Sequence, residues 1–436
     1  MEVIKKKLLV YAHYYHPDVA STGQILQELC EGLKNEFDIT VICAIPSYSG
    51  KVAEEYTTDK YYHENINGVK VVRIRVHAFT KDNKQSRIKN LISYFFGAVG
   101  ATLKSEKQDY IFTISQPPIL GGVLGVIGKW LKGGKMIYNI QDFNPEQTMA
   151  VGYSKNKLIL NVAMAVDKFS CRQADKVIVV GRDMQETLRK RFMNKNVPNN
   201  VFINNWIDEK EIYPLPEDNY KVTAFKKRYD LENKTVIMYS GNIGLYYDLE
   251  NLIEVIGRFK DRDDVVFAFV GDGTKKHDIE AYSNEHELKN VKFIPYQDKS
   301  DLIYSLNAGD VHWVVNAKGI KGVSVPSKLY GVMAAGKTVF GVLEDDSEAR
   351  LIIEECNCGV CIEPGNYDLI YQELKDVIEN IDNYKRLGIN GKEYIDRYIK
   401  KDVAIEKYSR EILCEEKLEK DIGSGEIISI QENSNV

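Results

Sequence analysis

The sequence predicts an α/β protein built from two doubly wound parallel-sheet domains of the Rossmann-like kind. Short runs rich in Val, Ile and Tyr alternate with helical patterns along the chain. Many of these runs are apolar on both faces, as are parallel strands that helices cover. The runs fall into two sets, and the 436 residues are about three times the usual ~150 of one domain. We therefore expect two domains of alternating strands and helices.

The expected strands divide into an N-terminal and a C-terminal set. The N-terminal set is Lys6–His13, Asp38–Ile45, Val69–Val76, Tyr110–Ser115, Met136–Gln141, Lys176–Val180 and Val201–Asn204. The C-terminal set is Thr235–Ser240, Val265–Val270, Val291–Pro295, Val311–Asn316, Thr338–Leu343 and Gly359–Glu363.

The boundary between the domains is expected within Asn205–Tyr220, because this stretch contains Pro214, Pro216 and polar turn-forming residues. We assign residues 1–207 to the N-terminal domain and 208–384 to the C-terminal domain. Residues 385–420 are expected to form helices that cross back to the N-terminal domain. The Gly/Ser/Asn-rich tail, 421–436, is expected to be disordered.

The charge balance disfavours a globally basic surface for nucleic acid. The chain has 58 Lys and Arg against 63 Asp and Glu, a net charge of −5. The apolar stretch near the N-terminus, Leu8–Ala12, is shorter than a signal-peptide core. No uncharged apolar run reaches the ~18–20 residues of a membrane span. We expect a cytoplasmic protein that contacts a membrane at most on its surface.

Seven cysteines, an odd number, suit a reducing compartment. Cys356, Cys358 and Cys361 form a C-x-C-x2-C cluster, but no fourth Cys or His lies near it in sequence. We interpret these three residues as structural thiols and predict no metal site.

Candidate ligand-binding residues follow the expected strands, because open α/β sheets bind ligands beyond the carboxyl ends of their strands. Ser21, Thr22 and Gly23 begin an amphipathic helix. Either the first N–H groups of this helix bind an anion, or the side chain of Ser21 or Thr22 caps the helix. Asp142 and Glu146 follow the fifth strand. Either they face the other domain, or Asp142 caps a turn and Glu146 is solvated.

Two glycine-containing loops follow neighbouring strands of the C-terminal set. The first loop runs from Gly241 through Asn242 to Gly244, and the second contains Gly271 and Gly273. Lys275 and Lys276 follow the second loop, and glycines with two cations suit a phosphate. Tight turns are the alternative. Neither loop completes G-x-G-x-x-G, so no dinucleotide cofactor is predicted.

The stretch 331–338, GVMAAGKT, fits the P-loop pattern, but its expected helix precedes the strand instead of following it. We therefore exclude a P-loop. The start of that helix is more informative, because Pro326, Ser327 and Lys328 combine a helix N-terminus with a cation. A first-turn Lys opposes the helix dipole, and a bound diphosphate would explain its presence.

The motifs YYHPD…STG, QDFNPE, YSGNIG, VGDGTKK and VPSKLYGVMAAGKTV together resemble the retaining family 4 glycosyltransferases with the GT-B fold. The resemblance runs from about Lys6 to Tyr408, and is strongest to bacterial O-antigen and capsule enzymes such as L-fucosamine transferases. It implies an acceptor site on the N-terminal domain facing a UDP-sugar site on the C-terminal domain. It also implies that the enzyme transfers a sugar, an N-acetylated amino sugar, to an undecaprenyl-diphosphate-linked saccharide. The anomeric configuration of the sugar would be retained, and no metal cofactor would be needed.

The resemblance assigns catalytic roles to Asp142, Lys276 and Lys328, with Gln141 replacing the histidine that often precedes this aspartate. Together with the strand-end loops it implies the substrate-binding residues Ser21, Thr22, Gly23, Gln141, Glu146, Asn242, Gly244, Gly271, Gly273, Lys275, Tyr296, Pro326, Ser327 and Tyr330.

The chain departs from the family pattern in two places. The usual pair of glutamates eight positions apart is replaced by Val323 and Gly331, and the usual Arg and Lys after the eighth strand by Asn242 and Tyr247. Lys275, Lys276 and Lys328 are the remaining cations for the diphosphate. A UDP-N-acetylglucosamine 2-epimerase of the same fold, or a non-catalytic sugar-nucleotide-binding partner, remains an alternative.

The segment Lys81–Lys107 has six cations and two acids, with apolar residues at helical spacing that include Ile88, Phe95 and Leu103. Tyr94 and Phe96 are expected to add amphipathic bulk to the same surface. This profile is typical of a helix lying on an anionic membrane, and a core helix with a basic, solvated end is the alternative. A lipid-linked acceptor favours the first interpretation, with the protein peripheral at the inner face of the cell membrane.

Overall fold

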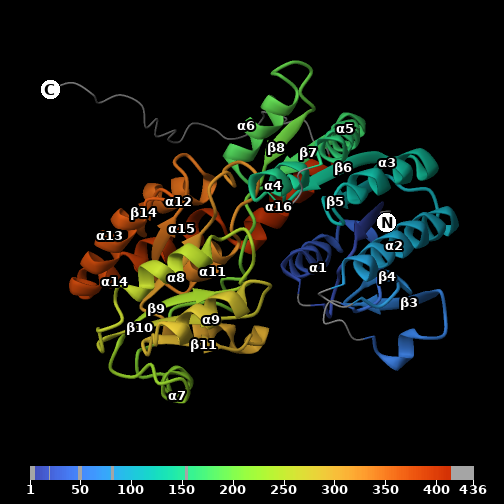
Figure 1. Ribbon diagram of the computed structural model, residues 1–436. Helices are drawn as coiled ribbons and strands as arrows, with labels where there is room; N and C mark the ends of the chain where they lie inside the picture. Colours follow the sequence, from blue (N-terminus) through green and yellow to red (C-terminus); the bar gives the residue numbers. More distant parts are fainter. Residues whose placement is uncertain (1–4, 19, 48–51, 80–82, 153–155, 414–436) are drawn as a thin grey trace, which may run out of the picture.

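The computed structural model describes residues 5–18, 20–47, 52–79, 83–152 and 156–413, which form two sheets with helices on both faces (Figure 1). The expected tail 421–436, the end of the segment 385–420 and residues 81 and 82 lie outside the described residues. The eight-stranded N-terminal sheet has the order β3-β4-β2-β1-β5-β6-β7-β8, and the six-stranded C-terminal sheet has the order β11-β10-β9-β12-β13-β14.

The N-terminal strands are β1 (Lys6–Ala12), β2 (Phe37–Ala44), β3 (Tyr61–Ile66), β4 (Val69–Ile74), β5 (Tyr110–Ile114), β6 (Lys135–Ile140), β7 (Lys176–Val179) and β8 (Asn200–Phe202). The C-terminal strands are β9 (Thr235–Ser240), β10 (Val265–Val270), β11 (Val291–Ile294), β12 (Val311–Val315), β13 (Thr338–Val342) and β14 (Gly359–Ile362). The predicted fold class is confirmed: two parallel-sheet, Rossmann-like domains.

Every expected strand has a counterpart, but the sequence analysis missed β3. This edge strand pairs antiparallel with β4, and the two are joined by Asn67 and Gly68, which have φ values of 51° and 91°. Its sequence, YYHENI, has three consecutive polar residues and lacks the continuous apolar run that indicates the other strands. The Asn-Gly pair before an apolar strand is a strong hairpin signal that would have located it.

The N-terminal sheet is covered on one face by α1 (Ser21–Leu33) and on the other by α2 (Lys84–Lys104) and α3 (Leu120–Lys132). Alternate side chains of β1 follow this division: Leu8 belongs to the cluster that contains α1, whereas Leu9 packs with the cluster of α2 and α3. The remaining helices of this domain are α4 (Asn144–Ala150), α5 (Lys157–Gln173) and α6 (Arg182–Arg191).

The C-terminal domain contains α7 (Tyr220–Arg228), α8 (Leu249–Gly257), α9 (Lys276–Glu285), α10 (Leu302–Ala308), α11 (Lys328–Ala334), α12 (Glu348–Cys356), α13 (Tyr367–Glu379), α14 (Ile381–Lys385) and α15 (Gly388–Tyr398). In the P-loop-like stretch, α11 comes before β13, which confirms that the helix precedes the strand and that the pattern is not a P-loop.

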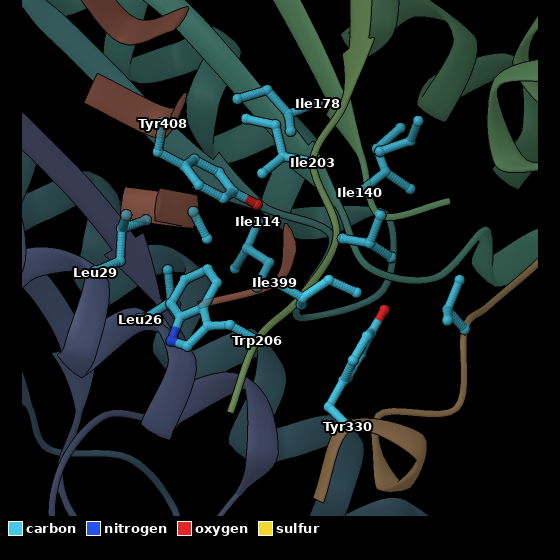
Figure 2. Packing of buried hydrophobic residues seen from close by; sticks show 14 of the residues in the cluster. Leu26, Leu29, Ile114, Ile140, Ile178, Ile203, Trp206, Tyr330, Ile399 and Tyr408 are labelled. Atoms are coloured by element: carbon cyan, nitrogen blue, oxygen red, sulfur yellow. The ribbon is translucent and has the colours of Figure 1, made fainter. Parts of the chain in front are cut away.

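The last described helix, α16 (Lys401–Leu413), lies on the N-terminal domain. Its Tyr408 accepts a hydrogen bond from Asn139 Nδ2 at 2.9 Å, and it pairs through Glu411 with Lys176. Figure 2 shows Tyr408 beside residues of α1 and β5 in a cluster that also includes Tyr330 of α11. One continuous apolar core therefore joins the two domains.

Candidate active site

The two glycine-containing loops of the C-terminal domain pack directly against each other. A Cβ on Gly271 would lie 2.1 Å from the carbonyl oxygen of Gly241, and a Cβ on Gly273 would lie 2.2 Å from that of Ile243. The amide of Ile243 donates to Asp272 O at 2.9 Å, which ties the loops together. The glycines at 271 and 273 are therefore required by close contact between backbones.

Lys328, the first residue of α11, reaches the carboxyl end of β9. Its Nζ donates a hydrogen bond to Tyr239 Oη at 2.6 Å and lies 4.0 Å from the ring centroid of Tyr239 and 3.8 Å from that of Tyr247. Within the described chain, no carboxylate forms an ion pair with Lys328. Burial lowers the pKa of Lys328 to about 7.

Tyr247 occupies the place where the resemblance leads us to expect a lysine. Its ring and that of Tyr239 hold the ammonium of Lys328, and Gly241 lies close by, since its Cβ would be 3.6 Å from Lys328 Cε. Aromatic faces attract a cation without neutralising it. The rings therefore place the Lys328 amine at the end of β9, where an anionic ligand would favour its protonated form.

Asp142 lies where the N-terminal domain meets the loop before α11. It forms an isolated antiparallel bridge with Ser324, and the amide of the next residue, Phe143, donates to Val323 O at 2.9 Å. Gln147 Nε2 donates to Asp142 Oδ1 at 3.4 Å. Burial raises the pKa of Asp142 to about 6, although hydrogen bonds from Ser324 and Gln147 oppose the shift.

Hydrogen bonds connect Asp142 to the first loop of the N-terminal domain. The hydroxyl of Ser115 accepts from the amide of Asp142 at 3.3 Å, and the neighbouring Gln116 accepts from Thr22 Oγ1 at 2.5 Å. Ser324 is four residues before Lys328 in the same loop and helix. The structure thus connects Thr22 and Asp142 through Ser115 and Gln116, and the Asp142–Ser324 bridge holds the segment before α11 against the N-terminal domain.

Four of the predicted site residues are committed to contacts inside the protein. The amide of Gln141 bonds both Asn139 and Asn205, Glu146 forms a bidentate ion pair with Arg191 at 2.5 and 2.6 Å, and Lys275 pairs with Glu250 and Asp278. Tyr330 is fully buried in the apolar core (Figure 2). The first three side chains therefore already have polar partners within the protein, and Tyr330 is part of the apolar core.

Other predicted residues keep exposed or loop positions. Ser21 is exposed at the start of α1, Asn242 is exposed in the β9–α8 loop, and Tyr296 is 51% exposed after β11. Gly23 approaches the backbone of Tyr14 closely, with a Cβ contact of 3.2 Å. Lys276 donates from Nζ to Gly271 O at 3.3 Å. Gly244 and Pro326 are buried and Ser327 is exposed, all within the C-terminal loops.

The alternative in which Ser21 or Thr22 caps α1 is wrong, because Ala20 occupies the N-cap position and no side chain caps that helix. Ser327 does occupy the N-cap position of α11, but its side chain makes no capping hydrogen bond. The hydroxyl of Thr22 is turned to Gln116 instead.

Four residues that contact the predicted site residues were not predicted: Tyr239, Ser115, Gln116 and Ser324. Tyr239 and Ser115 stand at or just after strand ends, which is the one signal that the sequence offers for them. Gln116 and Ser324 are recognisable only from contacts between segments that are distant in sequence.

Two family models match the chain, one over each domain. A family model described as "Glycosyl transferases group 1" matches residues 221–394, and one described as "Glycosyl transferase 4-like domain" matches residues 22–205. The chain is a glycosyltransferase whose C-terminal region matches the group 1 model and whose N-terminal region matches the 4-like model. Because the two matched regions correspond to the two sheets, both domains of this hexosyltransferase-type glycosyltransferase carry the family pattern.

Relatives of this glycosyltransferase cover nearly its full length. WcaI of Escherichia coli K12, a glycosyl transferase assigned to colanic acid biosynthesis, is 26% identical over 93% of this chain and 99% of its own. WbjE of Pseudomonas aeruginosa, assigned as a glycosyltransferase, is 24% identical over 94% of this chain and 100% of its own.

Solved structures show the same GT-B fold. Sucrose-phosphate synthase from Thermosynechococcus elongatus matches with a TM-score of 0.74 at 14% identity, over 94% of this chain and 100% of that one. HepE of Anabaena, solved with UDP and glucose, matches with a TM-score of 0.70 at 12% identity, over 94% and 100% of the two chains.

Proposed function

We propose that this glycosyltransferase moves a sugar, an N-acetylated amino sugar, from a UDP-sugar to an undecaprenyl-diphosphate-linked saccharide during assembly of a bacterial surface polysaccharide such as O-antigen or capsule. The relative WcaI, assigned to colanic acid biosynthesis, supports the polysaccharide context. The observation that carries the proposal is Lys328, a cation without an ion-pair partner in the described chain at the end of β9.

The donor site is proposed around Lys328 and the loops after β9 and β10. A departing UDP carries negative charge on its diphosphate, and cations placed in a partly buried site stabilise such charge. Lys276 lies at the start of α9 beside Gly271, and it is the second cation proposed for this role. HepE, a neighbour in fold, was solved with UDP-glucose. We propose that these lysines act in place of a bound metal.

Asp142 is proposed to polarise or position the reacting sugar from the N-terminal side. Its carboxylate is partly satisfied by Gln147 and Ser324, which fixes its direction. We propose same-face attack with retention, in which Asp142 forms no covalent intermediate. Glu146 is not its partner in a two-carboxylate mechanism, because Arg191 holds Glu146 in a bidentate ion pair.

The acceptor is proposed to reach the N-terminal domain from the inner face of the cell membrane, with α2 on the lipid surface. The expected role of Tyr94 on this surface is wrong, because its side chain is fully buried and donates to Ile42 O at 3.2 Å. The outer side of α2 instead carries Ile88, Ile92 and Phe96, which are 55%, 49% and 68% exposed.

The test is release of UDP from a panel of UDP-sugars, with and without an undecaprenyl-diphosphate-linked sugar. We expect release that depends on the acceptor, with the new glycosidic bond in the retained anomeric configuration. Formation of a free, isomerised UDP-sugar without acceptor would instead establish an epimerase. Binding of UDP-sugar without turnover under any acceptor would establish a non-catalytic binding partner and overturn the proposal.

A further inference from the structure

Three helices of the N-terminal domain form one continuous layer on the outside of the sheet. The central helix, α3, packs against α2 on one side and α5 on the other, and Figure 1 shows the three along the right-hand side of the domain. Lys132 of α3 donates to the carbonyls of Leu103 and Ser105 at 3.0 and 2.6 Å. Gly122 of α3 approaches Ser170 of α5, with a Cβ contact of 2.8 Å. We call the outer surface of this layer the α2–α3–α5 face.

The α2–α3–α5 face exposes large apolar side chains over its full width. On α3, Trp130 is 64% exposed and lies edge-on to Phe169 of α5 at a centroid distance of 6.1 Å. Ten large apolar residues of the three helices are at least 42% exposed: Ile88, Ile92, Phe96, Leu103, Trp130, Leu131, Leu158, Ile159, Val162 and Phe169. A group of this size on one side of a domain is typical of an interaction surface.

Helix α5 has apolar residues on the side where a helix of a globular domain usually has polar ones. Leu158, Val162 and Phe169 share one stripe at helical spacing and are 73%, 55% and 42% exposed. Its inward side contains the buried Asp167 and Cys171. The helix is amphipathic, but the polar acid faces the protein and the apolar stripe faces outward.

The charges of the same helices are almost all positive. By sequence, α2 contains four Lys and Arg, α3 contains two and α5 contains three, against a single carboxylate, Asp167. Asp167 is buried and pairs with Arg191 at 2.6 Å, so it does not offset the charge at the surface. The chain as a whole has a net charge of −5. The three helices therefore have a net positive charge in a chain that is acidic as a whole, although Lys129 pairs with Asp175 at 2.7 Å.

We propose that the α2–α3–α5 face is the surface with which the protein lies on an anionic phospholipid bilayer, and that α5 and the Trp130 end of α3 insert apolar side chains beside those of α2. Apolar side chains bordered by Lys and Arg match the boundary between acyl chains and anionic headgroups. A second copy of this chain fits poorly, since an isologous pairing of the face would place cations against cations.

This orientation deepens the proposed function, on which its biological meaning rests, because both edges of the face adjoin the candidate site. Helix α4 begins two residues after Asp142 and packs against α5. At the other edge, Asn90 of α2 contacts His13, the residue after β1, with 3.0 Å between Oδ1 and Nε2. A diphosphate-linked acceptor held in the bilayer would thus meet the cleft at the rim formed by these segments.

The test compares flotation of the purified full-length protein with vesicles of phosphatidylcholine alone and with phosphatidylglycerol added. We expect flotation that needs the anionic lipid and weakens with salt. The double variant Leu158→Glu with Val162→Glu should lower the bound fraction about tenfold or more, because it removes two inserting side chains and adds repulsion. Phe96→Glu should act in the same direction on α2. The matched control is Leu369→Glu with Ile389→Glu, two exposed apolar residues of the C-terminal domain.

Thermal melts check that the exposed substitutions leave the fold intact. Undiminished flotation of the α5 double variant would overturn the proposal, and so would a dimer in light scattering that the same variant dissociates. Flotation that depends on α5, combined with no transfer from any UDP-sugar, would leave the face established and refute the proposed function instead. With a water-soluble acceptor analogue, the α5 variant should turn over like the parent protein.

Discussion

Each domain brings one ionisable side chain to the region between the two sheets, and burial acts on the two in opposite directions. Burial raises the pKa of Asp142 to about 6 and lowers that of Lys328 to about 7. The surroundings of the two side chains differ. Asp142 already receives hydrogen bonds from Ser324 and Gln147, whereas Lys328 contacts the rings of Tyr239 and Tyr247 and the hydroxyl of Tyr239. An anionic ligand could therefore form an ion pair with Lys328 in the C-terminal domain. The carboxylate of Asp142 in the N-terminal domain already has most of its hydrogen bonds before a ligand binds.

The comparison predicts the largest loss of activity at Lys328. Replacement by Met keeps much of the packing between the rings of Tyr239 and Tyr247 but removes the charge. We expect UDP release to fall about 100-fold or more, as when one preorganised stabilising group is removed from an active site. Steady-state kinetics with the lipid-linked acceptor measure this effect.

The matched control for that variant is Lys292→Met, since Lys292 of β11 pairs with Asp230 on the outside of the same domain. It should retain parental rates. Equal rates for Lys328→Met and the parent protein would show that Lys328 does not stabilise the diphosphate. The contrast between the two domains would then not hold.

A smaller loss is expected at Asp142, because its role is to polarise or position the sugar. Asp142→Asn keeps the shape and should lower kcat about tenfold, or about 1.4 kcal/mol in the activation free energy. The pKa near 6 means that the carboxylate forms as the pH rises through that value. The parent enzyme should therefore gain activity through pH 6, and the variant should lose this limb of its pH profile. An unchanged acidic limb in Asp142→Asn would assign the titration to another group.

The sequence predicted the parallel strands well, because a strand covered on both faces must be apolar on both faces. Strand β10, VVFAFV, is buried along its whole length, and the sequence predicts its bounds, Val265–Val270. Strand β3 was not predicted, because it is an edge strand that pairs antiparallel with β4. It is only partly buried, and its sequence contains both polar and apolar residues. The edge strands β8, β11 and β14 were predicted because they pair parallel, so the rule fails at the antiparallel strand β3 and not at every edge.

The positions of the loops were predictable and the directions of their side chains were not. Parallel strands bring their carboxyl ends to one edge, so Asp142 and Lys328 could each be assigned from sequence to the ligand-binding edge of its sheet. No local pattern shows that Tyr247 packs on Lys328, or that Arg191 takes up Glu146. On α2, helical spacing alone did not separate the buried Tyr94 from the exposed residues beside it.

The smallest predicted effect is a proton linked to UDP binding. With a pKa of about 7, Lys328 is largely neutral above that pH in the free enzyme, and a diphosphate beside it would favour the ammonium. Binding should then take up a proton above pH 7, and the Kd for UDP should rise by at most about tenfold for each further pH unit. The last ionisation of the UDP phosphate has a pKa near 6 and is largely complete above pH 7, so it does not account for the proton uptake. Calorimetry in buffers of different ionisation enthalpy measures the uptake, which Lys328→Met should abolish. Proton uptake that persists in this variant would mean that a cation other than Lys328 meets the diphosphate.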